Sequence, residues 1–241
     1  MPWTPDPQVA TAAHLAFFDE HVAKREPRSP LPRVQSLAVG VSQWMHSSTW
    51  PDVEPVRYGF ASEGAAATRF GDGALVPGSG YGPPVLCVHQ PMVPVPSIGG
   101  AYDADLGDVG RVDQRRVQER TDVLCYTTAP LTEPMELYGA ARVSVDVRSH
   151  APTNDTCVTL CHVEPDGAAW NLAFGACRGS GRLTFDLSPV HALIPEGHRL
   201  RVAVAPSAYP EVDVNVSAGL QTQVTRALTS ESWIELPVRV R

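Results

Sequence analysis

The chain has 241 residues, of which 43% are hydrophobic and 19% charged, with a formal net charge of −7. This is the composition of an ordinary globular protein, long enough for one large β domain, or one domain with a helical appendage, around a substantial core. The negative charge and the absence of a basic run argue against nucleic-acid binding. No apolar run approaches the roughly 20 residues that span a bilayer, and the start of the sequence lacks the pattern of a signal peptide, so we expect a cytoplasmic protein that does not contact membranes.

Residues 1–30 are predicted to form an N-terminal helical segment, followed by a β domain over residues 31–241. Asp6 can cap the helix, and Pro27 and Pro30 are predicted to end it. Apolar residues give the helix a broad apolar side. They are Val9, Ala13, Leu15, Ala16, Phe17, Phe18 and Val22.

The first part of the β domain contains two short strand patterns, residues 37–41 and 56–60. Between them, Trp44, His46 and Trp50 are predicted to lie in a loop. An aromatic cluster in a loop can pack against another part of the protein or line a ligand pocket, and both interpretations stay open. We take the two tryptophans as candidate ligand-binding residues and His46 as a candidate acid or base.

Residues 77–113 are the least regular part of the chain, being rich in proline and glycine. His89 lies in an apolar strand pattern, residues 85–90, and is a core histidine or a catalytic candidate. The acidic run at residues 103–108 lacks the remaining ligands of a calcium loop, so we predict a solvated turn. The sequence indicates no metal site and no cofactor.

Two strong strand patterns occupy the middle of the chain. Residues 142–148 alternate strictly, with three valines on one face and polar side chains on the other. In the next run, residues 156–163, the alternation places His162 on the same face as two apolar residues. His162 is therefore a buried core histidine with a hydrogen-bond partner or a group beside a pocket, where Trp170 could join it.

The last part of the chain alternates again over residues 200–204 and 234–240. Between these runs lies a loop rich in polar groups. We take three of its side chains as candidate ligand-binding residues: Tyr209, Asp213 and Asn215.

The five cysteines are odd in number, and most lie within apolar strand patterns. A free thiol in such a position behaves as a small hydrophobic group, so a disulfide framework is not expected. They are Cys87, Cys125, Cys157, Cys161 and Cys177.

An ordered series of short motifs resembles the C-terminal jelly-roll domain of the cocaine-esterase and X-Pro dipeptidyl-peptidase (CocE/NonD) serine hydrolases. The motifs are Pro94 to Gly100, Asp113-Gln114-Arg115, residues 121–131, Gly139, Pro165-Asp166-Gly167, residues 183–189 and 195–201, Tyr209-Pro210 with Asp213 and Asn215, and Leu236-Pro237-Val238. The resemblance implies an all-β fold, an antiparallel jelly-roll β-sandwich that is galactose-binding-like, with one N-terminal helix.

The same resemblance implies that the N-terminal helix is the last helix of the family's α/β-hydrolase domain. In the family, a segment of the form Gly-Pro-Trp-Ser/Thr-His just before this helix carries the catalytic histidine. Here that segment reads Met1-Pro2-Trp3-Thr4-Pro5, with proline in place of histidine, and no Gly-x-Ser-x-Gly elbow occurs. Because nucleophile, base and carboxylate act as a unit, we expect no serine-hydrolase activity from this chain.

Three functions remain open from the sequence. The first, narrowly favoured, is a non-hydrolytic enzyme of specialised metabolism that uses His, Asp or Tyr groups for rearrangement, cyclisation or isomerisation of a small molecule. The second is an accessory module that binds a ligand or a partner. The third is a fragment or split subunit of a serine hydrolase, so the expected partners are a small molecule, a second copy of the chain or a hydrolase domain.

Overall fold

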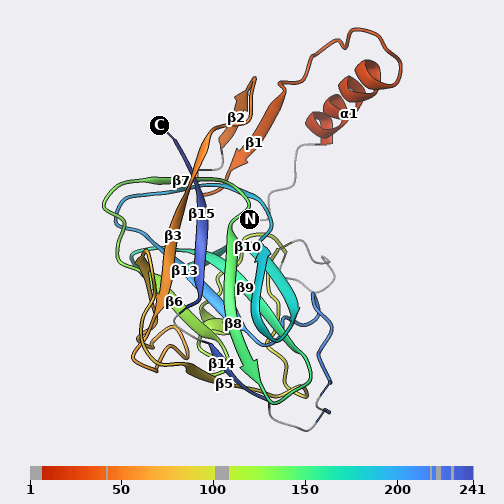
Figure 1. The fold of residues 1–241 in the computed structure, drawn as a ribbon. Coiled ribbons are helices and arrows are strands. Elements are labelled where there is room, and N and C mark those ends of the chain that lie inside the picture. The colour runs from red at the N-terminus through yellow and green to blue at the C-terminus, as the bar shows by residue number, and fades with distance from the viewer. Residues whose placement is uncertain are drawn as a thin grey trace.

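The computed structural model describes residues 7–41, 43–100, 109–217, 219–220, 224–228 and 231–240. Figure 1 shows a β-sandwich, with a helix and a small hairpin extending from one end. The elements are α1 (Pro7–His21), β1 (Val34–Ala38), β2 (Gln43–Ser47), β3 (Val53–Ala61), β4 (Ala74–Pro77), β5 (Val85–His89), α2 (Arg115–Gln118), β6 (Leu124–Thr128), β7 (Met135–Gly139), β8 (Arg142–Ser149), β9 (Asn154–Val163), β10 (Ala169–Gly179), β11 (Gly181–Asp186), β12 (Val190–Ile194), β13 (Arg199–Ala205), β14 (Val224–Leu228) and β15 (Trp233–Arg239).

The sandwich is one continuous path of hydrogen-bonded strands that folds over on itself. Its order is β10-β9-β13-β6-β4-β3-β15-β8-β14-β5, with β11 paired to β8, and β7 paired to both β12 and β15. All pairings in it are antiparallel except the short one between β4 and β6. The predicted antiparallel jelly-roll β-sandwich is therefore confirmed.

The main core lies between the two layers and is built from the alternating strands. Val143 and Val145 of β8, Leu160 of β9, Leu200 of β13 and Ile234 of β15 are all fully buried there. The predicted apolar face of β8 is confirmed. Its other face is also largely buried, since Ser144 and Asp146 have little exposed surface. Ser144 accepts a hydrogen bond from Thr184 of the paired strand β11.

A second, smaller apolar cluster covers the outer face of β6, β9 and β13. Val95, Val117 and Val123 lie over it and meet Cys157 and Ala203 of the sheet. The described residues 93–100 and 109–123 thus form a cover over one side of the sandwich. Four of the five cysteines are buried, with Cys87 in the main core and Cys125 and Cys157 in this second cluster.

The N-terminal helix does not pack on the sandwich. Figure 1 shows α1 standing apart from the strands and connected to them through the β1–β2 hairpin. The segment after α1 turns back on the helix, where Arg25 pairs with Asp19 and Ala16 is buried. We call residues 7–47 the N-terminal extension. The division into domains at residue 30 stays a prediction.

Candidate functional site

The N-terminal extension exposes large apolar side chains to solvent. The exposed fractions are 60% for Leu15, 50% for Phe17, 54% for Phe18 and 67% for Val22. Leu15, Phe18 and Val22 follow the three- and four-residue spacing that places side chains on one face of a helix. The predicted apolar side of the helix exists, but nothing in the described part of the chain covers it.

The β1–β2 hairpin is held to the sandwich by a chain of hydrogen bonds. The Tyr138 hydroxyl donates to Ser36 Oγ at 2.8 Å, and Ser36 Oγ lies 2.9 Å from His191 Nδ1. His191 Nε2 lies 3.0 Å from Glu136 Oε1, which also accepts from Arg239 at 2.9 Å. Because Ser36 Oγ already accepts from Tyr138, its own proton goes to Nδ1, and Nε2–H donates to Glu136.

This chain of groups has the serine, imidazole and carboxylate order of a hydrolase triad, but it serves to anchor the hairpin. The Ser36 hydroxyl sits between Tyr138 and His191, and His191 is itself buried. Burial alone would raise the pKa of Glu136, but the hydrogen bonds from Arg239 and His191 outweigh it and hold that pKa below its usual value. The carboxylate therefore stays charged and fixes both partners.

Trp44 and His46 lie on strand β2 and not in a loop, which corrects the prediction. They pair across the hairpin with Leu37 and Gln35, and both are exposed. The strand forms because β1 supplies a partner edge that the sequence pattern did not reveal. Trp50, just after β2, packs edge-on against Tyr138, with ring centres 4.9 Å apart.

His162 is buried inside a polar cluster at the end of β9. It pairs in the sheet with Trp170 of β10, so the structure brings these two predicted residues together. Arg111 donates to His162 Nδ1 at 3.1 Å, and His162 Nε2 lies 2.7 Å from His198 Nδ1. Since a guanidinium can only donate, Nε2 carries the proton of His162 and donates it to His198.

The surroundings of His162 favour the neutral form of its imidazole. Burial, followed by the neighbouring His198 and Arg111, lowers the pKa of His162 to about 4. Arg111 also stacks over Trp170 at 4.9 Å and lies 3.9 Å from Glu164. Both ring nitrogens of His162 are occupied, so His198, which is only partly buried, is the member that could act on a ligand.

The other predicted site residues make contacts within the β-sandwich, and a binding or catalytic role for them stays a prediction. His89 is buried on β5. Asn215 is buried and donates to Asp155, which forms an ion pair with Arg178 at 2.6 Å. The backbone carbonyl of Asp213 accepts from the same Arg178.

Tyr209 contributes mainly through its backbone. Its N–H donates to the Val95 carbonyl, and its own carbonyl accepts from Ser97, so the loop holds the segment 95–97 in place. The structure does not bring these loop residues to His162, and His46 and Trp44 lie on the separate hairpin. The acidic run 103–108 and the capping residue Asp6 lie outside the described residues.

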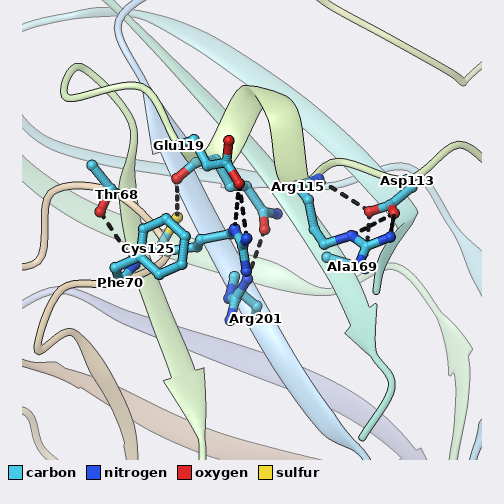
Figure 2. Close-up of polar contacts among 10 residues, drawn as sticks. Thr68, Phe70, Asp113, Arg115, Glu119, Cys125, Ala169 and Arg201 are labelled. Carbon is cyan, nitrogen blue, oxygen red and sulfur yellow. Dashed lines mark hydrogen bonds and ion pairs between the residues drawn. The ribbon is translucent and has the colours of Figure 1, made fainter. Parts of the chain in front are cut away.

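The short helix α2 organises a buried polar network that the sequence did not indicate (Figure 2). Asp113 accepts from the backbone N–H of Arg115, the first residue of α2, and from that of Ala169, which ties the start of the helix to β10. At its other end, Gln118 Oε1 accepts from Arg201 at 2.8 Å, and Gln118 Nε2 donates to the Cys161 thiol. Through these contacts, residues 113–118 fix the cover to the sheet.

The thiols in this network are inert. Burial raises the pKa of Cys125 and of Cys161 to about 12, against the weaker opposing effect of Arg201. A nucleophilic cysteine needs the thiolate form, so neither group is available for covalent catalysis near neutral pH.

Comparison with known proteins agrees with this architecture. The family described as X-Pro dipeptidyl-peptidase C-terminal non-catalytic domain matches residues 29–232. Cocaine esterase from Rhodococcus sp. (strain MB1 Bresler) is 33% identical over 232 residues, covering 88% of this chain and 40% of that enzyme.

Two solved structures share the fold. An α-amino acid ester hydrolase superposes with a TM-score of 0.74 at 23% identity, over 92% of this chain and 44% of its own. An aminopeptidase from a marine sediment Thaumarchaeota archaeon gives 0.75 at 22% identity, over 99% of this chain and 45% of its own. The chain thus spans less than half the length of these relatives. It belongs to the X-Pro dipeptidyl-peptidase C-terminal non-catalytic domain family, the jelly-roll domain of the CocE/NonD hydrolases.

Proposed function

We propose that this chain serves as the non-catalytic β-sandwich domain of an ester- or peptide-hydrolysing enzyme. In this proposal, the N-terminal extension packs against an α/β-hydrolase domain, which carries the catalytic residues. The observation that carries it is the exposed apolar face of α1, where Leu15, Phe18 and Val22 are each more than half exposed.

The energetics of α1 support a missing partner. A helix of 15 residues is marginal in water by itself, and most helices depend on packing of an apolar face. Burying each large apolar side chain contributes about 1.5–3 kcal/mol, so three such residues are enough to hold the helix against a second surface. The sandwich does not provide that surface, since α1 stands apart from it.

The chemistry of the partner follows from the relatives. The chain aligns with only 40% of cocaine esterase, which leaves most of that enzyme beyond the region of similarity. An α/β-hydrolase domain is the partner that the resemblance of α1 to the last helix of such a domain implies. Both enzyme names among the solved structures, an ester hydrolase and an aminopeptidase, fit this class of reaction.

A chimeric enzyme tests the proposal. Residues 7–240 of this chain would replace the aligned part of Rhodococcus cocaine esterase, and esterase activity and thermal unfolding of the chimera would be measured. We expect a soluble, active chimera with a single unfolding transition. Replacing Leu15 and Phe18 together by Asp should lower activity at least about tenfold, because two buried apolar contacts become unpaired charges. Glu20→Gln, an exposed polar change on the same helix, is the matched control and should have no effect.

Two results would contradict the proposal. One is a chimera in which the Asp variants and the control behave alike. The other is a doubled mass of the isolated chain by light scattering that the Asp variants abolish, since a second copy would then be the natural cover of α1.

A non-hydrolytic small-molecule enzyme is the second candidate, favoured only by the His162–His198 pair. In that function His198 would exchange protons with the ligand while His162, held by Arg111, sets its tautomer. The expected result is a ligand whose turnover is lost in His198→Ala but retained in His150→Ala, a variant of an exposed histidine elsewhere.

A further inference from the structure

A cavity of about 170 Å³ lies beneath the cover on the outer face of the sandwich. Its roof is the segment 95–100 together with α2, and its floor is the outer face of β9, β10 and β13. The two motifs at residues 94–100 and 113–115 therefore meet over the same space. Gly99 allows this close approach, because its φ of +78° and a Gly110 carbonyl 2.7 Å from the position of a Cβ leave no room for a side chain.

The cavity exists because its floor is made of small residues. Ala203, Ala205 and Ala208 contribute only methyl groups, where leucine or valine would fill the space. The roof is larger and apolar, with Val95 and Val117 in it, and Phe174 of β10 lines the cavity beside the alanines. A cavity of about 150 Å³ is known to hold benzene, so this one has room for a ligand of similar size.

The cavity is open to solvent over the middle of β9. Every residue of that strand is buried except Thr159, which lines the cavity and is partly exposed. A strand in the centre of a sheet would not expose one residue in this way unless the space above it were accessible. A ligand can therefore enter without unfolding the cover.

Gln114 lines the cavity and is 5% exposed. Its Nε2 donates to the carbonyls of Ile98 and Val112 at 2.9 and 3.2 Å, which fixes the orientation of the amide. With both of these bonds made by Nε2, the amide oxygen Oε1 is the atom of Gln114 that can accept a hydrogen bond from a ligand.

The charge on the cavity wall is negative. Glu211 is the single charged side chain among its described lining residues, and its Oε2 accepts from Ser97 at 2.7 Å, leaving Oε1 without a partner from that part of the chain. A carboxylate beside an apolar space attracts a cation and repels an anion, more strongly than it would in bulk water.

We propose that this cavity binds a small primary ammonium ion with a compact apolar body. The ammonium group pairs with the Glu211 carboxylate, Gln114 Oε1 offers a further acceptor for a ligand donor, and the apolar body packs on the alanine floor. This site is separate from the apolar face of α1 and does not depend on a hydrolase domain. It extends the role of the domain from support to recognition of an amine.

Isothermal titration calorimetry with benzylammonium chloride at neutral pH tests the site in the full chain. We expect saturable binding with a stoichiometry of one, much weaker binding of benzyl alcohol, and none of benzoate. Glu211→Gln should weaken binding of benzylammonium at least about tenfold, because a charge-assisted hydrogen bond is lost. Glu133→Gln, which changes an exposed carboxylate outside the cavity, should leave the affinity unchanged.

A second variant tests the contribution of the apolar space separately from that of the Glu211 charge. Ala205→Leu fills the floor and should abolish binding of benzylammonium, with circular dichroism and thermal unfolding checking that the sandwich persists. Glu211→Gln leaves the volume of the cavity unchanged, so the two variants are expected to lose benzylammonium binding for different reasons. No binding at millimolar concentration, equal affinity for benzyl alcohol and benzylammonium, or full affinity in both variants would each overturn the proposal.

Discussion

Large apolar side chains are buried in the sandwich but exposed to solvent in the N-terminal extension. In the sandwich, Leu160 of β9 is fully buried, whereas Leu15 of α1 is 60% exposed. The first region closes its own core from strands that lie far apart in the sequence, but the second has only a short helix and a two-stranded hairpin. The difference indicates that the sandwich is a self-sufficient folding unit and that the extension is completed by another surface.

The largest effect should come from a matched pair of leucine truncations. Leu160→Ala removes methyl groups from the centre of the core and should lower the free energy of unfolding by about 2–5 kcal/mol. Leu15→Ala should change it by less than about 0.5 kcal/mol, because its side chain is already in water. Urea unfolding of both variants measures the contrast, and equal losses would show that α1 is part of the folding unit.

A change of pH probes the sandwich through His162. Its folded-state pKa of about 4 lies below the ordinary value of about 6.5, so the unfolded chain binds more protons between these values. Stability should thus be fully present above about pH 6.5 and fall as pH is lowered toward 4, by roughly 2 kcal/mol from this residue. His162→Gln should flatten the profile in that window, and His150→Gln, at an exposed site, should not.

The hairpin anchor should have a smaller, local effect. Ser36→Ala removes the Ser36 hydroxyl from the Tyr138 hydroxyl and from His191 Nδ1, and should cost about 1 kcal/mol. Faster hydrogen exchange of the β1 and β2 amides, with unchanged exchange in β8 and β9, is the expected result. Ser48→Ala, at an exposed position beside β2, serves as the control. Uniformly faster exchange across the chain would show that the hairpin is not a separate unit.

The fold could be predicted because its strands carry a local signal. The alternation in β8 and β9, and the ordered motifs between Pro94 and Val238, specify the strands and their family. The position of α1 could not be predicted in the same way. An apolar helix face shows that something covers it but does not say what.

The polar clusters could be predicted from the sequence only in part. The placement of His162 beside Trp170 follows from adjacent strands, and the sequence anticipated it as one of two possibilities. The chain of Ser36, His191 and Glu136 joins three segments that lie 155 and 55 positions apart, and no local pattern marks any of them. The sequence predicts a loop for Trp44 and His46, because residues 43–47 carry no strand pattern of their own and form β2 only by pairing with β1.

Hydrogen exchange of the α1 amides, compared between the isolated chain and the chimera with the hydrolase part of cocaine esterase, tests the central claim most directly. The account predicts that α1 exchanges rapidly in the isolated chain and is protected about a hundredfold or more in the chimera, while β8 and β9 exchange equally in both. Equal exchange of α1 in the two proteins would contradict the claim that this helix is the surface on which a hydrolase domain packs.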